Sequence, residues 1–248
     1  MIELKSAREI EEMKAAGSIA AQALLLVAQA VRPGVRTQEL DSIARRFITK
    51  SGAEPSFLGY NGYPAAICAS VNDEVVHGIP GERVLKEGDI VSIDLGAKYK
   101  GFHGDCAITV GVGEITREAK RLIEVTEKSF YAGMNAFREG NRLVNISEAV
   151  QKTAESEGFS VVRELVGHGI GRKLHEEPSV PNFVSKNRGP RLEAGMVLAI
   201  EPMINSGAKE TYTRADGWTV CTKDGKLSAH YENTVALTKN GPVILTAV

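Results

Sequence analysis

Four acidic residues stand in segments that are otherwise apolar and rich in β-formers. Asp94 lies within DIVSIDLGA and Glu201 within MVLAIEPMI, while Asp105 precedes CAITV and Glu232 opens ENTVAL. A buried carboxylate costs free energy unless a partner compensates its charge. One such acid alone is better explained by a solvent-facing strand position or by an ion pair with Lys or Arg. Four of them in strand contexts favour a shared cation.

Asp94 and Asp105 are also spaced to meet across a hairpin. If the chain turns around Tyr99 and Lys100, with Gly101 easing the turn, positions 94 and 105 fall opposite each other. Two facing acids repel and must share a proton or a cation. Carboxylates with one imidazole suit Mn²⁺, Fe²⁺, Co²⁺ or Zn²⁺. Four carboxylates exceed the needs of one ion, which predicts two ions about 3.5–4 Å apart.

The imidazole comes from His168, which three glycines flank in GHGIG. Glycine there lets a backbone or a substrate approach closely. A glycine-rich turn with an incidental histidine is the simpler interpretation, but His77 occupies the same HGI tripeptide. His175 follows His168 by seven residues and can reach the same cleft. The segment LHEEP is not the HExxH motif of zinc proteases.

Two further histidines, His103 and His230, lie next to acids. Each could support a metal ligand through a hydrogen bond or simply face solvent, and both interpretations stay open. Other catalytic motifs are absent: the sequence has no GxSxG elbow, no GxxxxGK[ST] loop and no GxGxxG after a strand. The cysteines Cys68, Cys106 and Cys221 stand alone, without CxxC spacing, which favours packing roles and a reducing cytosol over a disulfide framework.

Composition restricts the class of partner. Of 248 residues, 43% are hydrophobic and 25% charged, with a formal net charge of −1. No basic field indicates nucleic acid or an anionic membrane. The longest apolar run, 19–31, is broken by two glutamines and is too short to span a bilayer, and the N-terminus lacks the apolar segment of a signal peptide. The sequence predicts a soluble cytoplasmic protein.

The elements that must position these residues alternate between helices and strands. A capping box at Ser6 and Glu9 begins a helix that Arg32-Pro33-Gly34 ends, and a second helix is predicted over 37–50. Further helices are predicted over 116–137 and 145–157. Strands are predicted in AAICASV, DIVSIDLGA, CAITVGVG, FSVVREL, MVLAIEPMI, WTVCT, ENTVALT and PVIL.

The order of two helices followed by strands occurs twice. Several short matches recur at an offset of 106–107 residues, among them RPG against REG and the segments that precede Asp94 and Glu201. Chance recurrence explains any one match better than it explains several at one offset. We therefore predict a duplicated α+β unit, with halves near 1–112 and 113–248, joined as one domain with a cleft between them.

With these features together, the sequence resembles the type I methionine aminopeptidases over essentially its whole length. The resemblance is carried by FLGYNGYPAAICASVNDEVVHGIP, GDIVSIDLGA, GFHGDCAITV, FSVVRELVGHGIGRKLHEEP, GMVLAIEPMI, DGWTV and LSAHYENTVAL. It implies the pita-bread fold, in which two α/β halves related by a pseudo-twofold axis share a curved antiparallel sheet flanked by helices. It also implies removal of the N-terminal methionine from nascent chains, with a small second residue preferred.

The resemblance also assigns roles to individual residues. The implied metal ligands are Asp94, Asp105, His168, Glu201 and Glu232, with Asp105 and Glu232 bridging two divalent ions of Co, Mn, Fe, Zn or Ni. His77 and His175 would contact the substrate, and Glu201 would be the general base. The substrate pocket would be lined by Phe57, Tyr60, Tyr63, Cys68, Leu174 and Trp218. Asn72 and Ser228 fall near a monovalent-cation site of the family.

Three positions depart from the pattern of some relatives: Phe57 replaces a cysteine, Leu174 a phenylalanine and His230 a glutamine. The changes at Phe57 and Leu174 affect the shape and selectivity of the pocket, and the effect of His230 stays open. The compact members of the family are usually monomers, and a transient ribosome contact is implied by a nascent-chain substrate.

Two alternatives share the fold. An Xaa-Pro dipeptidase uses the same ligands but usually carries a large N-terminal domain, whereas the catalytic helices here begin at residue 6. A non-catalytic binding module would have lost metal ligands, whereas all five are present.

Overall fold

The structure is a computed structural model that describes residues 2–248. Its helices lie where periodicity and capping predict them. Ser6 and Glu9 form the expected capping box at the first helix, with the Glu9 backbone N–H donating to Ser6 Oγ and the Ser6 N–H donating to Glu9 Oε2. The helices are α1 (Ala7–Ala30), α2 (Thr37–Lys50), α3 (Arg117–Ala136), α4 (Leu143–Ser156) and the short 3₁₀ helix η1 (Tyr60–Gly62).

Most strands belong to one sheet, which is built from hairpins and from pairs between segments that are distant in the sequence. In chain order the strands are β1 (Glu54–Pro55), β2 (Ile67–Val71), β3 (Glu74–Val76), β4 (Ile90–Tyr99), β5 (Phe102–Gly111), β6 (Ser160–Val161), β7 (Gly167–Gly169), β8 (Glu176–Val180), β9 (Val197–Ile200), β10 (Met203–Asn205), β11 (Thr211–Thr213), β12 (Val220–Thr222), β13 (Ser228–His230), β14 (Glu232–Thr238) and β15 (Gly241–Ile244).

The main sheet has nine strands, and every pair in it is antiparallel. Its central order is β1-β4-β5-β14-β9-β7-β8, with β2 also on β4 and β15 also on β14. The strands β5 and β14 therefore join the part of the sheet built early in the chain to the part built late. This arrangement confirms the predicted α+β class and its central antiparallel sheet.

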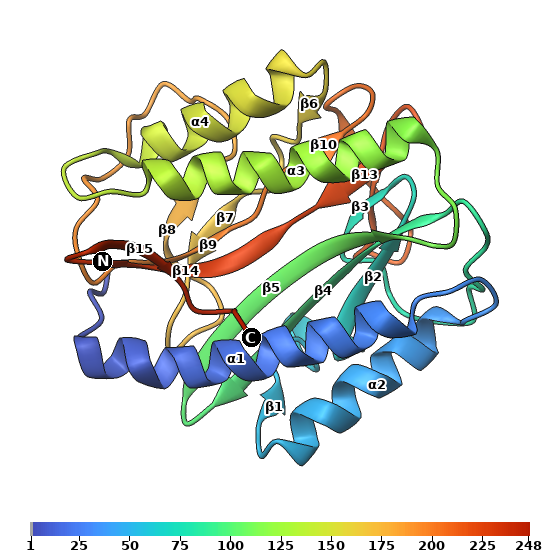
Figure 1. The fold of residues 1–248 in the computed structure, drawn as a ribbon, viewed down its shortest axis with the longest axis horizontal. Coiled ribbons are helices and arrows are strands. Elements are labelled where there is room, and N and C mark those ends of the chain that lie inside the picture. The colour runs from blue at the N-terminus through green and yellow to red at the C-terminus, as the bar shows by residue number, and fades with distance from the viewer. Residues whose placement is uncertain (1) are drawn as a thin grey trace.

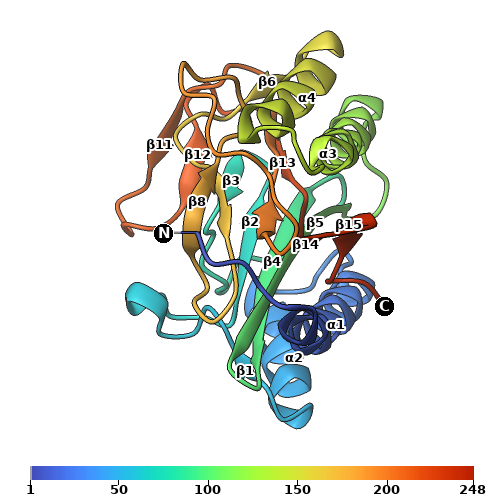
Figure 2. The same ribbon diagram turned by 90° about the vertical axis from the view of Figure 1, so that its left-hand side faces the viewer.

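The helices cover one side of this sheet. Figure 2 shows α1 and α2 below α3 and α4, all on the same side of the strands, and in Figure 1 α1 and α3 run across the front of the sheet. Within residues 2–248, α1 is the one helix long and apolar enough to span a membrane by length and composition. Its apolar residues, Met13, Ala16, Ala20, Leu24 and Val27 among them, are buried against the protein.

The contact of α1 with the sheet depends on two glycines. A Cβ on Gly104 of β5 would lie 2.6 Å from Gly17 Cα, and a Cβ on Gly17 would lie 2.3 Å from the Leu245 carbonyl oxygen. These distances are shorter than any real contact, so the helix backbone can rest on the strand only where neither residue has a side chain. The same face of the sheet is thus covered by α1 and by the segment that follows β15.

The hairpin of β4 and β5 corrects the predicted register. Its loop is Lys100 and Gly101, both with positive φ (50° and 82°), and Tyr99 pairs with Phe102. A two-residue loop of this kind fixes the pairing of the strands. Asp94 therefore lies opposite Ala107, and Asp105 opposite Gly96. The expectation that the two acids pair directly is wrong by two residues, but a shift of two keeps both side chains on one face.

A second correction concerns MVLAIEPMI, which was predicted as one strand. It divides into β9 and β10, and Glu201 lies in the break between them. Pro202, which follows, has no backbone N–H for a sheet ladder, so the strand cannot continue through it. Strand β6 is also shorter than the predicted FSVVREL. The division of the chain into halves at 1–112 and 113–248 stays a prediction.

Candidate metal centre and substrate pocket

The acidic side chains come together because their strands are neighbours in the sheet. Asp94 and Glu232 both lie opposite Ala107, one from each side, so the three residues form one row across β4, β5 and β14. Side chains in such a row point to the same face of the sheet. Asp105 is two residues from Ala107 and shares that face. Glu201 follows directly after Ile200, which pairs with Asn233, and so extends the same row.

The next row brings in the histidine. His168 of β7 pairs with Ala199 of β9, and Ala199 pairs with Thr234 of β14. The Thr234 hydroxyl in turn accepts a hydrogen bond from the Asp105 backbone N–H at 2.9 Å. His168 thus lies on the face that carries the carboxylates, one row along from Glu201 and Glu232.

Burial makes these carboxylates electrostatically unfavourable by themselves. Asp94, Asp105 and Glu232 are 8%, 3% and 2% exposed. Burial raises the pKa of Asp94 to about 8, and burial together with the other acids raises the pKa values of Asp105, Glu201 and Glu232 well above their usual range. One buried oxygen on each of Asp94, Asp105 and Glu232 has no hydrogen-bond partner within residues 2–248. Such a group needs either protons or a cation.

His168 is prepared to act as a neutral ligand. Its Nδ1 lies 2.8 Å from the Gly169 carbonyl oxygen and donates its proton there, which leaves the lone pair on Nε2. Nε2 lies 3.6 Å from Glu201 Oε1 and 4.0 Å from Asp105 Oδ2. Burial, followed by the nearby His175, lowers the pKa of His168 to about 3. Ligand atoms of Asp105, His168 and Glu232 all lie within 4.8 Å of one another, so these residues fit a divalent ion.

The flanking glycines have a steric reason. A Cβ on Gly167 would lie 2.4 Å from the Ala199 carbonyl oxygen, and one on Gly169 would lie 2.2 Å from the Glu177 carbonyl oxygen. The strands on both sides of β7 can therefore approach it only if these residues are glycine. The glycine pattern around His168 therefore lets β7 pack between β8 and β9 rather than serving as a flexible turn.

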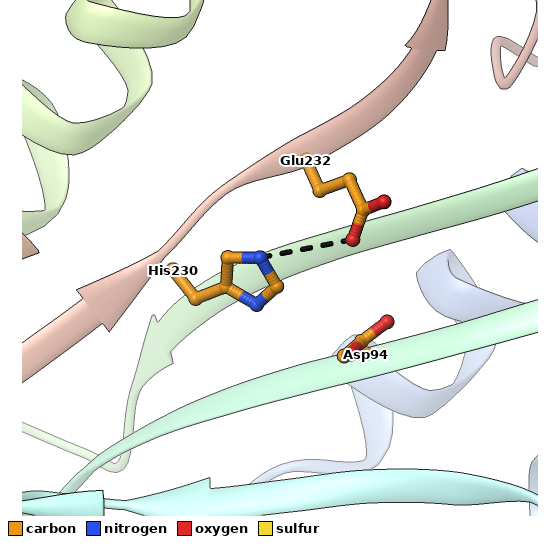
Figure 3. A group of neighbouring side chains, drawn as sticks. All are labelled: Asp94, His230 and Glu232. Carbon is orange, nitrogen blue, oxygen red and sulfur yellow. Dashed lines mark ion pairs between the residues drawn. The ribbon is translucent and has the colours of Figure 1, made fainter. Parts of the chain in front are cut away.

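His230 also belongs to this cluster, as Figure 3 shows together with Asp94 and Glu232. It is 1% exposed, and its Nε2 lies 3.8 Å from Glu201 Oε2 and 3.7 Å from Glu232 Oε2. Burial, with a smaller effect of His77, lowers its pKa to about 3. His103 is buried as well, and its Nδ1 lies 2.9 Å from Ser56 Oγ. The open alternative that either histidine faces solvent is therefore wrong.

The four carboxylates line a cavity of about 230 Å³. Every residue predicted to contact the substrate lines it: Phe57, Tyr60, Tyr63, Cys68, His77, Leu174, His175 and Trp218. Cys68 pairs with Asp94 across β2 and β4, so the apolar part of the cavity lining lies beside the carboxylates. Asn61 also lines the cavity and was not predicted; its positive φ of 49° in η1 is not visible in the sequence.

Aromatic contacts fix the walls of this cavity. The rings of Tyr63 and Trp218 meet edge to face with centroids 5.1 Å apart. Tyr60 stacks on His175 at 5.2 Å, and its hydroxyl lies 2.9 Å from His175 Nδ1. His77 adopts a left-handed backbone conformation (φ 60°). Burial, and next the charge of His175, lowers the pKa of His77 to about 4.

Asn72 and Ser228 lie side by side away from these walls. The Ser228 backbone N–H donates to the Asn72 carbonyl at 2.9 Å, and the Asn72 side-chain amide donates to Asp89 Oδ1 at 2.9 Å. A monovalent cation near these residues stays a prediction.

Comparison with known proteins places this fold and site in a defined class. The family described as metallopeptidase family M24 matches residues 11–239. The chain therefore belongs to metallopeptidase family M24. The similar prolidase from Pyrococcus furiosus (TM-score 0.79, 23% identity, covering 99% of this chain and 65% of that one) shares the fold alone.

Closer relatives cover the whole chain. Methionine aminopeptidase of Clostridium perfringens is 58% identical over 248 residues and methionine aminopeptidase 1 of Bacillus subtilis 55%, in both cases over 100% of each chain. The crystal structure of methionine aminopeptidase from Thermotoga maritima aligns with a TM-score of 0.98 at 44% identity, over 100% of both chains. Within family M24, the chain thus groups with the methionine aminopeptidases, and the predicted pita-bread fold is confirmed.

Proposed function

We propose that this protein is a methionine aminopeptidase that hydrolyses the first peptide bond of chains beginning with methionine. One observation carries the proposal: a single cavity is lined both by the carboxylate and histidine cluster and by Tyr63, Cys68 and Trp218. An apolar, aromatic site containing a sulfur atom suits a thioether side chain. The carboxylates suit the positively charged α-amine of a substrate, which explains a preference for chain termini.

We assign the metal ligands to Asp94, Asp105, His168, Glu201 and Glu232. Divalent ions in such a site lower the pKa of water and polarise a carbonyl group. The partnerless oxygens of Asp94, Asp105 and Glu232 are the observation that supports this assignment. Two ions of Co, Mn, Fe, Zn or Ni fit this set of donors.

Glu201 is the proposed general base. Its carboxylate follows directly after β9 and lines the cavity, where it can accept a proton from the attacking water and return it to the leaving amine. His175 is held by Tyr60 through Nδ1, which leaves Nε2 to stabilise the tetrahedral oxyanion. His77, whose ring lies edge to face with that of Trp218, would orient the substrate amide.

Finer features of the function follow from the same assignment. A small second residue would be preferred, as the resemblance to the type I methionine aminopeptidases implies. The physiological substrate would be a nascent polypeptide in the cytoplasm, with a transient ribosome contact and a monomeric enzyme. A monovalent cation near Asn72 and Ser228 would complete the set of bound ions.

The test is a peptidase assay of a metal-defined preparation against Met-Ala-Ser and Ala-Pro. We expect release of methionine from the first peptide, no cleavage of the second, loss of activity on chelation and recovery with Mn²⁺, Co²⁺ or Fe²⁺. Preferential cleavage of Ala-Pro would assign the protein to the Xaa-Pro dipeptidases. Full activity in the metal-stripped protein would rule out metal catalysis.

A further inference from the structure

One buried group beside the proposed metal ligands has no task in the function proposed above. His230 ends β13, where it pairs with Met203 of β10, and its side chain is 1% exposed. Neither ring nitrogen has a hydrogen-bond partner within residues 2–248. A buried polar atom without a partner is unfavourable, so a ring with two of them needs an explanation.

The surroundings of His230 match those of His168. His168 Nε2 lies 3.6 Å from Glu201 Oε1, and His230 Nε2 lies 3.8 Å from Glu201 Oε2. The two imidazoles therefore flank the two oxygens of one carboxylate. Each also approaches a second acid: Asp105 at 4.0 Å for His168 and Glu232 at 3.7 Å for His230.

These distances distinguish a shared cation from a direct hydrogen bond. An N–H donor lies about 2.7–3.2 Å from its acceptor, so 3.7–3.8 Å is too long. Two ligand atoms that are each about 2.0–2.2 Å from one ion lie roughly 3.3–4 Å apart at the angles common in metal sites. Ligand atoms of Asp94, His230 and Glu232 lie within 4.8 Å of one another, as do those of Asp105, His168 and Glu232.

We propose that His230 is a sixth metal ligand, whose Nε2 completes the site formed by Asp94 and Glu232. This inference rests on the dinuclear site proposed above. Each of the two ions would then have one imidazole, rather than one ion having only oxygen ligands. A nitrogen donor on the Asp94 side favours Mn²⁺, Fe²⁺, Co²⁺ or Zn²⁺ over Mg²⁺ at that position.

The experiment counts coordinated imidazoles directly. Protein labelled with ¹⁵N-histidine is loaded with two equivalents of Co²⁺, and the hyperfine-shifted ring N–H signals are recorded by NMR. We expect two such signals in the unmodified protein. His230→Gln should lose one and His168→Gln the other. Calorimetric titration should show the second Co²⁺ binding roughly 10- to 100-fold more weakly to His230→Gln.

His103→Gln is the matched control, because His103 is also buried (8% exposed) but its Nδ1 faces Ser56 rather than a carboxylate. It should keep both signals. A single signal in the unmodified protein, lost in His168→Gln and kept in His230→Gln, would overturn the inference and leave the proposed function intact. Absence of any shifted signal would overturn both the sixth ligand and the proposed dinuclear site. The Met-Ala-Ser assay tests the proposed peptidase activity separately. The signal count in the unmodified protein decides the question even if His230→Gln does not fold.

Discussion

Asp105 is one of the acids whose charge acts on the rest of the cluster. It contributes to the raised pKa values of Glu201 and Glu232, and its own backbone is held by the Thr234 hydroxyl. Asparagine has the same shape as aspartate but no charge, so Asp105→Asn removes a ligand without creating a cavity. The carboxylate matters for binding a cation, whereas the position is secured by the backbone.

We expect Asp105→Asn to lower metal-dependent release of methionine by more than ~100-fold, since loss of a group behind a ligand already costs about 10–100-fold in metal affinity or activity. The metal-free variant should melt at a higher temperature than the metal-free parent protein, because one of several repelling buried charges is gone. Peptidase assay, metal analysis and calorimetry measure these effects. Normal turnover after metal reconstitution would disprove the ligand assignment.

At this scale the sequence predicts the acids well and the histidines less well. A carboxylate in an apolar strand is visible as a residue out of place, and all four predicted acids line one cavity. His230 carries no such signal, because histidine is common both inside and outside proteins. Only the pairing of β13 with β10, which is a contact between distant segments, shows that its ring is turned toward Glu201 and Glu232.

At the scale of elements, the hairpin loop determines where the acids lie. The sequence indicated a turn with Gly101, but the register depends on which two residues take positive φ. These residues are Lys100 and Gly101, so the observed pairing of β4 with β5 differs from the predicted pairing by two residues. The side chains stayed on one face because the error was an even number of residues. Local composition thus predicts the hairpin and its face, while the turn geometry decides the exact partners.

The close contact of α1 with the sheet gives a prediction for Gly17→Ala. Alanine has a higher helix propensity by about 1 kcal/mol, but its Cβ would meet the backbone of Leu245, which cannot rotate away. We expect a net loss of about 1–3 kcal/mol in the free energy of unfolding, measured by urea denaturation. Gly133→Ala in α3 is the control, since its Cβ would meet a side-chain methyl group of Val150 rather than backbone atoms. An equal or smaller loss for Gly17→Ala would contradict this account.

At the scale of the molecule, the cluster links stability to pH and metal. Burial raises the pKa of Asp94 from 3.8 to about 8, so between these values the folded protein holds a proton that the unfolded chain has released. The free energy of unfolding therefore falls as pH rises toward 8. Above pH 6.5, the ordinary pKa of histidine, the buried histidines are neutral in both states and do not oppose this trend.

We accordingly expect the metal-free protein to melt at a lower temperature at pH 8 than at pH 6.5, as measured by calorimetry in the presence of a chelator. Saturating Mn²⁺ should raise the melting temperature and remove the decline, because bound cations compensate the ionised carboxylates. Asp105→Asn should show a smaller decline without metal. A metal-free melting temperature that is constant or rises over this interval would contradict the role of the cluster.

The packing of α1 on the sheet also has a consequence for the synthesis of the protein on the ribosome. The apolar face of this helix leaves the ribosome early, yet its partners are β5 and, through Gly17, the segment at Leu245 near the other end of the chain. At roughly 5–20 residues per second, the helix must wait on the order of tens of seconds for that segment. During this interval the part of the helix around Gly17 lacks one of its partners. The candidate metal centre, whose residues come from β4 through β14, is likewise complete only near the end of translation.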